Sequence, residues 1–251
     1  MPEPSVYDVV VISKRNEMAN PELAGVLMRG HFITFEGGEG SGTTTHTATL
    51  AQRLKSLGLE VVLTREPGGS TGAEIIRHIL LSGMAKPLGA ETEAILFAAA
   101  RDDHVRNTIL PALQSGRWVI CDRFIDSTRV YQGILGNVDQ RLIRSLERIT
   151  VGSAFPELTF ILDVPAQIGL ARATRRRGRH TADRFESESV EFHEKLRQAY
   201  RTAASEERER CIVVDGRAPR DVVSERIWSV VRERLRPEEA VPFDVESQRL
   251  V

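Results

Sequence analysis

The sequence predicts a three-layer α/β fold, in which a parallel sheet is flanked by helices on both faces. Short apolar runs alternate along the chain with longer segments of helical spacing, which is typical of this class. A length of 251 residues suits one such domain. Hydrophobic residues make up 41% of the chain, which is enough for a sizeable core and excludes wholesale disorder.

Each expected element is an apolar run or a periodic segment bounded by turn residues. The expected strands are His31–Phe35, Glu60–Thr64, Trp118–Cys121, Leu158–Asp163 and Cys211–Asp215. The expected helices are Thr44–Leu57, Ala73–Leu81, Glu91–Gln114, Asp126–Ile134, Asp139–Thr150, Pro165–Arg177, Ser189–Ser205 and Pro219–Leu235. Pro111 is expected to break the end of the third helix, because proline has no N–H to give to a helix interior.

Both ends of the chain are expected to lie outside the domain, which spans residues 31–236. Residues 1–30 form an N-terminal extension, which we expect to be disordered or to add a strand at Val9–Ile12. Residues 237–251 are polar and lack helical period, which favours a loose C-terminal tail.

Charge and composition argue against several function classes. Lys and Arg number 34 against 35 Asp and Glu, so no global basic field favours nucleic acid or an anionic membrane as a partner. No apolar run reaches the roughly 18 to 20 residues of a membrane span, and the first residues lack a signal-peptide pattern. Cys121 and Cys211 each adjoin an apolar run and are expected to be buried thiols. We expect a cytoplasmic protein.

The segment after the first strand has the pattern of a phosphate-binding loop. Its glycines allow backbone N–H groups to approach phosphate oxygens, and the following helix adds partial positive charge. The segment fits G-x-x-x-x-G-K-[ST] at every defining position except Thr43, which occupies the lysine position. The residues expected to bind the phosphates are Gly37, Gly38, Glu39, Gly40, Ser41, Gly42, Thr43, Thr44 and Thr45.

A predicted metal site combines this loop with the end of the third strand. Asp122 leaves the carboxyl end of a parallel strand, where ligands bind in such sheets. A carboxylate at this point can hold Mg²⁺ through water, and the phosphate-loop pattern assigns the Thr44 hydroxyl to the same ion. We therefore expect Thr44 and Asp122 to be metal residues and Mg²⁺ to be the cofactor.

A second group of residues has the chemistry of a pocket for a nucleotide base. Phe97 and Arg101 lie four apart on one helix, so an aromatic plane and a guanidinium face the same way. Such a pair can stack on a base and bind its edge, although Phe97 by itself would be a core residue. Neutral hydrogen-bonding groups follow the third strand at Ser127, Thr128, Tyr131 and Gln132.

A series of motifs occurs in order from about residue 31 to 215: FEGGEGSG, TREPGG, FAAAR, DRF with STRVYQG, LDVP and an arginine-rich segment ending in DRFE. Together they resemble the bacterial thymidylate kinases. The resemblance implies a P-loop nucleoside-monophosphate kinase fold, usually a homodimer, which transfers the γ-phosphoryl of MgATP to dTMP and gives dTDP. The dimer surface would then be built from the helices around residues 91–114 and 126–150.

The same resemblance assigns roles to individual residues. Glu39 would lie near the acceptor sugar, while Arg77 and Arg123 would hold the acceptor phosphate or bridge the reacting groups. Phe97 would stack on thymine and Arg101 would contact its edge. Ser127, Thr128, Tyr131 and Gln132 would line the nucleoside pocket.

Residues 172–184 concentrate arginine in a chain of net charge -1. A solvated face and a nucleic-acid patch are alternative interpretations of such a run. Its position after LDVP matches the lid that the family has over ATP, and Arg175 and Arg177 match the lid arginines that supply charge. An arginine can stabilise phosphoryl transfer from within the chain. We hypothesise that the lid supplies the charge that Thr43 cannot.

Three functions remain open at this point, and Thr43 is the residue that separates the first two. The first is an active dTMP kinase, and the second is a nucleotide-binding homologue with impaired or lost catalysis. Losing one preorganised donor to a transition state costs about 10²–10³ in rate. The third is a kinase for another nucleoside monophosphate, against which the pair Phe97 and Arg101 and the pair Tyr131 and Gln132 argue.

Overall fold

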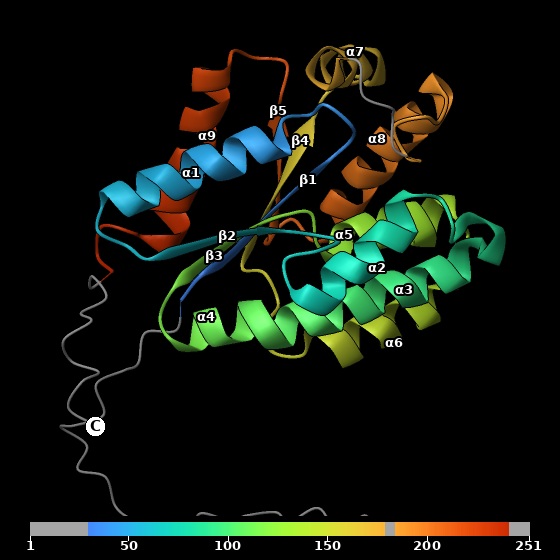
Figure 1. Ribbon diagram of the computed structural model, residues 1–251. Coiled ribbons are helices and arrows are strands. Elements are labelled where there is room, and N and C mark those ends of the chain that lie inside the picture. The colour runs from blue at the N-terminus through green and yellow to red at the C-terminus, as the bar shows by residue number, and fades with distance from the viewer. Residues whose placement is uncertain (1–29, 179–183, 241–251) are drawn as a thin grey trace, which may run out of the picture.

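The computed structural model describes residues 30–178 and 184–240 (Figure 1). Within them, five parallel strands form one sheet in the order β2-β3-β1-β4-β5. The strands are β1 (Phe32–Gly37), β2 (Val61–Arg65), β3 (Trp118–Asp122), β4 (Leu158–Asp163) and β5 (Cys211–Asp215). The predicted α/β fold with a parallel sheet is confirmed, and each predicted strand is present.

Helices cover both faces of the sheet, as Figure 1 shows. One face is covered by α1 (Thr43–Ser56) and α9 (Arg220–Leu235), which share a core with β1, β4 and β5. The opposite face is covered by α4 (Leu110–Gln114), α5 (Ile125–Thr128) and α8 (Val190–Glu206). Beyond them on that side pack α2 (Thr71–Leu81), α3 (Gly89–His104) and α6 (Gln140–Val151), while α7 (Ala166–Arg177) follows β4 and packs on α8.

The central strand β1 is buried along its whole length, because β3 and β4 flank it and helices cover both faces. This explains its almost continuous apolar run, which is expected of a parallel strand covered on both sides. The edge strand β2 is more exposed, and Leu63 keeps 47% of its surface open. The two cysteines are buried and free, as predicted.

Two predicted helices are interrupted by wide π turns. The segment expected as one helix, Glu91–Gln114, consists of α3, the π turn η2 (Val105–Ile109) and α4. Pro111 lies in the first turn of α4 and the chain stays helical to Gln114, so the prediction that it breaks the helix is wrong. The π turn widens the backbone just before the proline, where its ring and missing N–H are accommodated.

A second π turn, η3 (Arg129–Leu135), continues α5 over the predicted helix Asp126–Ile134. A short 3₁₀ helix, η1 (Lys86–Leu88), was not predicted. Of the other expectations, the extension over residues 1–29, the tail from residue 241 and residues 179–183 of the lid lie outside the described residues. The boundaries of the domain stay a prediction. In the described part of the chain, no helix is both long and apolar enough to cross a bilayer.

Candidate functional site

A cavity of about 460 Å³ lies at the carboxyl edge of the sheet, where the loops after β1, β2 and β3 meet. Parallel pairing brings these loops together, because Phe35 and Arg65 are both in register with Asp122. The predicted residues in its wall are Gly38, Glu39, Gly40, Gly42, Thr43, Thr44, Arg77, Phe97, Arg101, Asp122, Arg123, Ser127, Thr128, Tyr131 and Gln132. The phosphate loop and the residues predicted to bind the acceptor nucleotide therefore share one cavity.

The phosphate loop has the shape that its glycines predict. Gly40 and Gly42 have φ of 66° and 102°, in the left-handed region that favours glycine. A Cβ on Gly40 would lie 2.0 Å from the carbonyl oxygen of Gly169, and one on Gly169 would lie 2.3 Å from that of Glu39. The loop and α7 thus approach each other backbone to backbone. Gly169 was missed in the sequence because nothing in α7 marks this contact.

Three of the predicted loop residues are not among the described residues that line the cavity. Gly37 ends β1, and its carbonyl accepts a hydrogen bond from Arg123 at 3.0 Å. Ser41 is buried beside Gly37. Thr45 is exposed, and its carbonyl accepts a hydrogen bond from Thr49. Thr43, at the lysine position, is 8% exposed in the first turn of α1 and does line the cavity.

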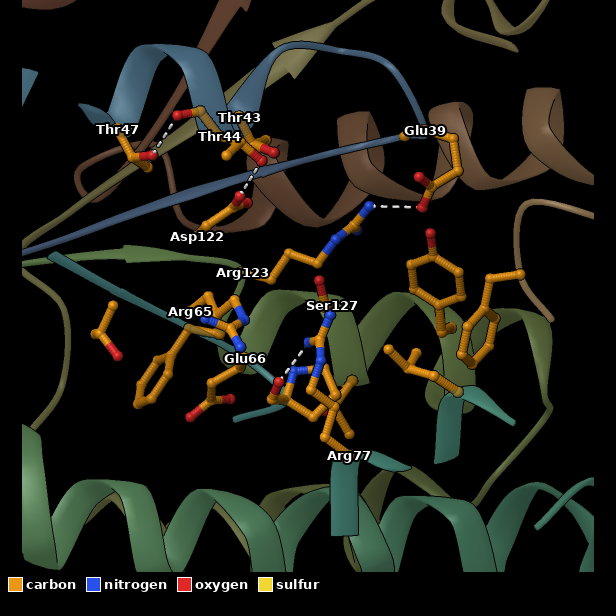
Figure 2. A pocket seen from close by; sticks show the side chains of 18 of the residues that line it. Glu39, Thr43, Thr44, Thr47, Arg65, Glu66, Arg77, Asp122, Arg123 and Ser127 are labelled. Carbon is orange, nitrogen blue, oxygen red and sulfur yellow. Dashed lines mark hydrogen bonds and ion pairs between the residues drawn. The ribbon is translucent and has the colours of Figure 1, made fainter. Parts of the chain in front are cut away.

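The proposed metal residues are adjacent. The Thr44 hydroxyl donates to Oδ2 of Asp122 at 2.5 Å, as Figure 2 shows. Oδ1 of Asp122 is buried and has no hydrogen-bond partner among the described residues. An unpartnered carboxylate oxygen beside a hydroxyl is a set of hard oxygen ligands, which suits Mg²⁺. No cluster of three or more His, Cys, Asp or Glu side chains suited to a metal occurs in the described part of the chain. These residues therefore fit an ion that takes its remaining ligands from phosphates and water.

Arg123 extends across the cavity from the end of β3 toward Glu39 (Figure 2). Its Nη2 donates to Oε1 of Glu39 at 2.8 Å, and its Nη1 donates to the hydroxyl of Tyr200 at 3.2 Å. Burial opposes the charge on Arg123, but Tyr131 and Glu39 outweigh it and raise the pKa above its ordinary value. The side chain is therefore a fixed cation beside the phosphate loop.

Arg101 is held in a buried group of polar side chains. Its Nε donates to Glu66 at 2.8 Å, and its Nη2 donates to the hydroxyl of Thr128 at 2.9 Å. His104 contacts the other carboxylate oxygen of Glu66 at 3.1 Å and Thr64 at 2.7 Å. Because Nε and Nη2 of Arg101 both bond to protein groups, the orientation of its guanidinium in the cavity wall is fixed.

The remaining part of the cavity wall near Arg101 contains aromatic side chains and a second arginine, Arg77. Phe97 and Tyr131 lie 6.4 and 5.2 Å from Phe185, measured between ring centroids. Arg77 donates from Nη1 to the carbonyl of Pro67 at 2.5 Å. Phe185 belongs to the DRFE motif, and only its aromatic character could have marked it in the sequence.

The arginines at the end of α7 differ in position. Arg176 lines the cavity, whereas Arg175 is exposed and Arg177 is half-buried, and neither of these two is in the described cavity wall. Arg176 and Arg177 both pair with Glu186, at 3.2 and 2.7 Å. The assignment of catalytic roles to Arg175 and Arg177 stays a prediction.

Comparison with known proteins shows the family of this chain. The family model for thymidylate kinase matches residues 35–227. A thymidylate kinase of Bradyrhizobium sp. strain BTAi1 is 58% identical over 207 residues, which cover 82% of this chain and 92% of that protein. One of Afipia carboxidovorans is 59% identical over 207 residues, with 82% and 91% covered.

A solved structure is similar as well. The crystal structure of thymidylate kinase from Ehrlichia chaffeensis superposes with a TM-score of 0.64 and 33% identity, covering 81% of this chain and 99% of that one. None of these comparisons supports the alternative of a catalytically impaired homologue. The chain therefore belongs to the thymidylate kinase family and is a nucleotide-binding phosphotransferase.

Proposed function

We propose that this chain transfers the γ-phosphoryl of ATP to dTMP and releases dTDP. The observation that carries the proposal is that one cavity joins a phosphate-binding loop to an acceptor wall containing Phe97 and Arg101. An aromatic plane with a fixed guanidinium suits a pyrimidine base with hydrogen-bonding edges. Catalysis would then rest on alignment and charge, because phosphoryl transfer needs little covalent chemistry from the protein.

Each wall of the cavity has a role in this reaction. The backbone N–H groups of the loop bind the donor phosphates at the beginning of α1. Arg77 and Arg123 hold the acceptor phosphate or bridge the reacting groups, and Glu39 lies toward the acceptor sugar. Thr128, Tyr131 and Gln132 complete the nucleoside pocket.

Mg²⁺ is the cofactor that the Thr44 and Asp122 oxygens suit. Thr44 would bind the ion directly and Asp122 through water. When bound, Mg²⁺ neutralises charge on the phosphates during transfer. In this chain the need for that neutralisation is greater, since Thr43 brings no charge to the lysine position.

A direct assay tests the proposal. The purified chain is incubated with MgATP and dTMP, dTDP is measured, and a Thr43→Lys variant is run beside it. We expect dTDP from the unmodified chain and a kcat higher by up to about 10²–10³ in Thr43→Lys, the usual effect of one preorganised donor. Competition by other nucleoside monophosphates checks the choice of base. Absence of dTDP from both proteins would contradict the proposal.

We also propose that the chain forms a homodimer through the α3 and α6 side of the molecule. Ile95 on α3 and Ile149 on α6 are exposed by 49% and 68%, although both are large and apolar. Sedimentation analysis of the wild type and of Ile149→Glu tests this, with Ile168→Glu on α7 as the control. We expect only Ile149→Glu to weaken the dimer, and a monomeric wild type would contradict the proposal.

A cytoplasmic location stays a prediction.

A further inference from the structure

Arg123 has a backbone conformation that its own residue type disfavours. Its φ is 68°, in the left-handed region, at the turn between β3 and α5. Such a conformation costs about 1–3 kcal/mol in a non-glycine residue and persists only where surrounding contacts impose it. The contacts that impose it here must act on the segment directly after Arg123, because the preceding residues are fixed in the sheet.

Most of those contacts come from one carboxylate, and Arg101 adds a hydrogen bond from its Nη2 to the carbonyl of Phe124 at 3.3 Å. Glu36 lies on β1, one residue before the phosphate loop, and is completely buried. Its Oε1 accepts hydrogen bonds from the backbone N–H groups of Phe124 at 2.7 Å and Ser127 at 3.3 Å. Its Oε2 accepts from the Ser127 hydroxyl at 2.6 Å. The carboxylate therefore holds the first turn of α5 against β1, immediately after Arg123.

The same carboxylate reaches the guanidinium through Tyr200. The Tyr200 hydroxyl lies 3.3 Å from Oε2 of Glu36 and 2.9 Å from the Ser127 hydroxyl, and it accepts from Nη1 of Arg123. Burial raises the pKa of Tyr200 well above its ordinary value, so the hydroxyl keeps its proton and can donate. Glu36 thus holds the backbone after Arg123 directly and reaches the guanidinium through Tyr200, in addition to the direct bonds of the guanidinium to Glu39 and Gly37.

We propose that Glu36 is a positioning residue for phosphoryl transfer, which fixes Arg123 relative to the phosphate loop. This inference rests on the reaction proposed above. Glu36 is not among the described residues that line the cavity, so it acts through Arg123 and not on a substrate. Displacement of a catalytic group by about 1 Å can cost on the order of 10² in rate.

The hydrogen-bonding pattern of Glu36, more than its charge, performs this role. Burial, with the nearby Asp126 carboxylate, raises the pKa of Glu36 to about 7 against hydrogen bonding from Ser127 and the charge of Arg123. When Oε2 is protonated, it donates to the hydroxyl of Ser127 or Tyr200 instead of accepting from it, and Oε1 still accepts from the backbone. Glutamine offers the same pair of groups, whereas alanine offers neither.

The kinetic test compares Glu36→Ala, Glu36→Gln and a control, Glu147→Ala. Glu147 is also a buried glutamate, and it pairs with Arg129 away from the cavity. We expect Glu36→Ala to lower kcat by about 10–100-fold with little change in the KM for ATP. Glu36→Gln recovers most of this loss, and Glu147→Ala loses stability without a matching loss of kcat in the folded protein. An unchanged kcat in folded Glu36→Ala overturns the proposal.

A double-mutant comparison separates positioning from general destabilisation. In an Arg123→Ala background, Glu36→Ala causes no further fall in kcat, because the group that it positions is already absent. If Glu36→Ala lowers kcat by the same factor in the Arg123→Ala background as in the wild type, the proposal is contradicted.

A spectroscopic measurement distinguishes this inference from the proposed function. The ¹⁵N guanidinium signal of Arg123, assigned by its loss in Arg123→Ala, is followed in the nucleotide-free protein. Glu36→Ala shifts or broadens this signal, whereas Glu36→Gln and Glu147→Ala leave it near its wild-type position. If the wild type makes no dTDP but the signal responds in this way, the proposed reaction fails and the positioning role stands. An unchanged signal in Glu36→Ala overturns the inference whatever the turnover.

Discussion

The two halves of the cavity hold their charges in different ways. On the acceptor side, Arg101 is buried and bonded to Glu66 and Thr128, so its position is set before any ligand arrives. On the donor side, the loop offers backbone N–H groups and an uncharged Thr43. The Arg176 side chain at the end of α7 is 60% exposed and pairs only loosely, at 3.2 Å, with Glu186.

This contrast predicts that a threonine at the lysine position leaves phosphate binding largely intact. Backbone N–H groups and a helix dipole bind phosphate without any particular side chain. We therefore expect binding of the donor phosphates to depend weakly on the side chain at position 43, and turnover to depend on which cation reaches the phosphates. On the acceptor side, the site consists of buried side chains that bond to one another. Changing one of them leaves its buried partners without their hydrogen bonds or ion pair.

The largest expected effect concerns the source of charge on the donor side. Replacing Arg175 and Arg177 together by alanine is predicted to lower kcat by about 10³ or more, the range seen for a catalytic arginine. Steady-state dTDP formation measures it, with Arg176→Ala as the comparison, since Arg176 is the one of the three in the cavity wall. Unchanged turnover in the double variant, with a loss in Arg176→Ala, would move the role to Arg176.

On the acceptor side, Arg101→Met is predicted to lower the free energy of unfolding by about 3–5 kcal/mol, because Glu66 loses its buried cation. Urea denaturation measures this. The control is Arg65→Ala, whose pair with Glu74 is about half exposed and contributes less than about 1 kcal/mol. Equal losses in the two variants would remove the distinction between buried and exposed pairs.

Glu36 is expected to make the free energy of unfolding depend on pH, with the sign opposite to that of most carboxyl groups in proteins. Burial raises the pKa of Glu36 to about 7 in the folded chain from its ordinary value of 4.5, so between these values the folded state binds more protons than the unfolded state. The free energy of unfolding therefore falls as pH rises through this window, by up to about 3 kcal/mol. Denaturation at a series of pH values measures it. Glu36→Gln removes this contribution, and an identical pH curve in that variant would contradict the assignment.

The smallest expected effect concerns the contact between the loop and α7. Gly169→Ala places a Cβ 2.3 Å from the Glu39 carbonyl oxygen, which is predicted to cost about 1–3 kcal/mol and to weaken ATP binding. Calorimetry of ATP binding and thermal denaturation measure both. Ala171→Ser adds an atom to an exposed position of the same helix and serves as the control. If the two variants behave alike, the close approach has no consequence.

Much of the fold and most of the cavity wall could be predicted from the sequence. Strands are short apolar runs, the loop after β1 is marked by its glycines, and parallel pairing places Asp122 beside that loop. The π turn before Pro111 could not be predicted, because a local widening of the helix leaves no trace in hydrophobic spacing. The contact of Gly169 with the loop was missed for a similar reason.

By itself, the sequence determined the order of the elements, the phosphate loop and most of the side chains that line the cavity. Those properties follow from short-range patterns, in which neighbouring residues carry the information. Only the tertiary structure decided that Arg176 and not Arg175 faces the cavity, and that Tyr200 meets Glu36 across 164 residues. Such contacts depend on how helices pack on the sheet, and that packing is a property of the whole core.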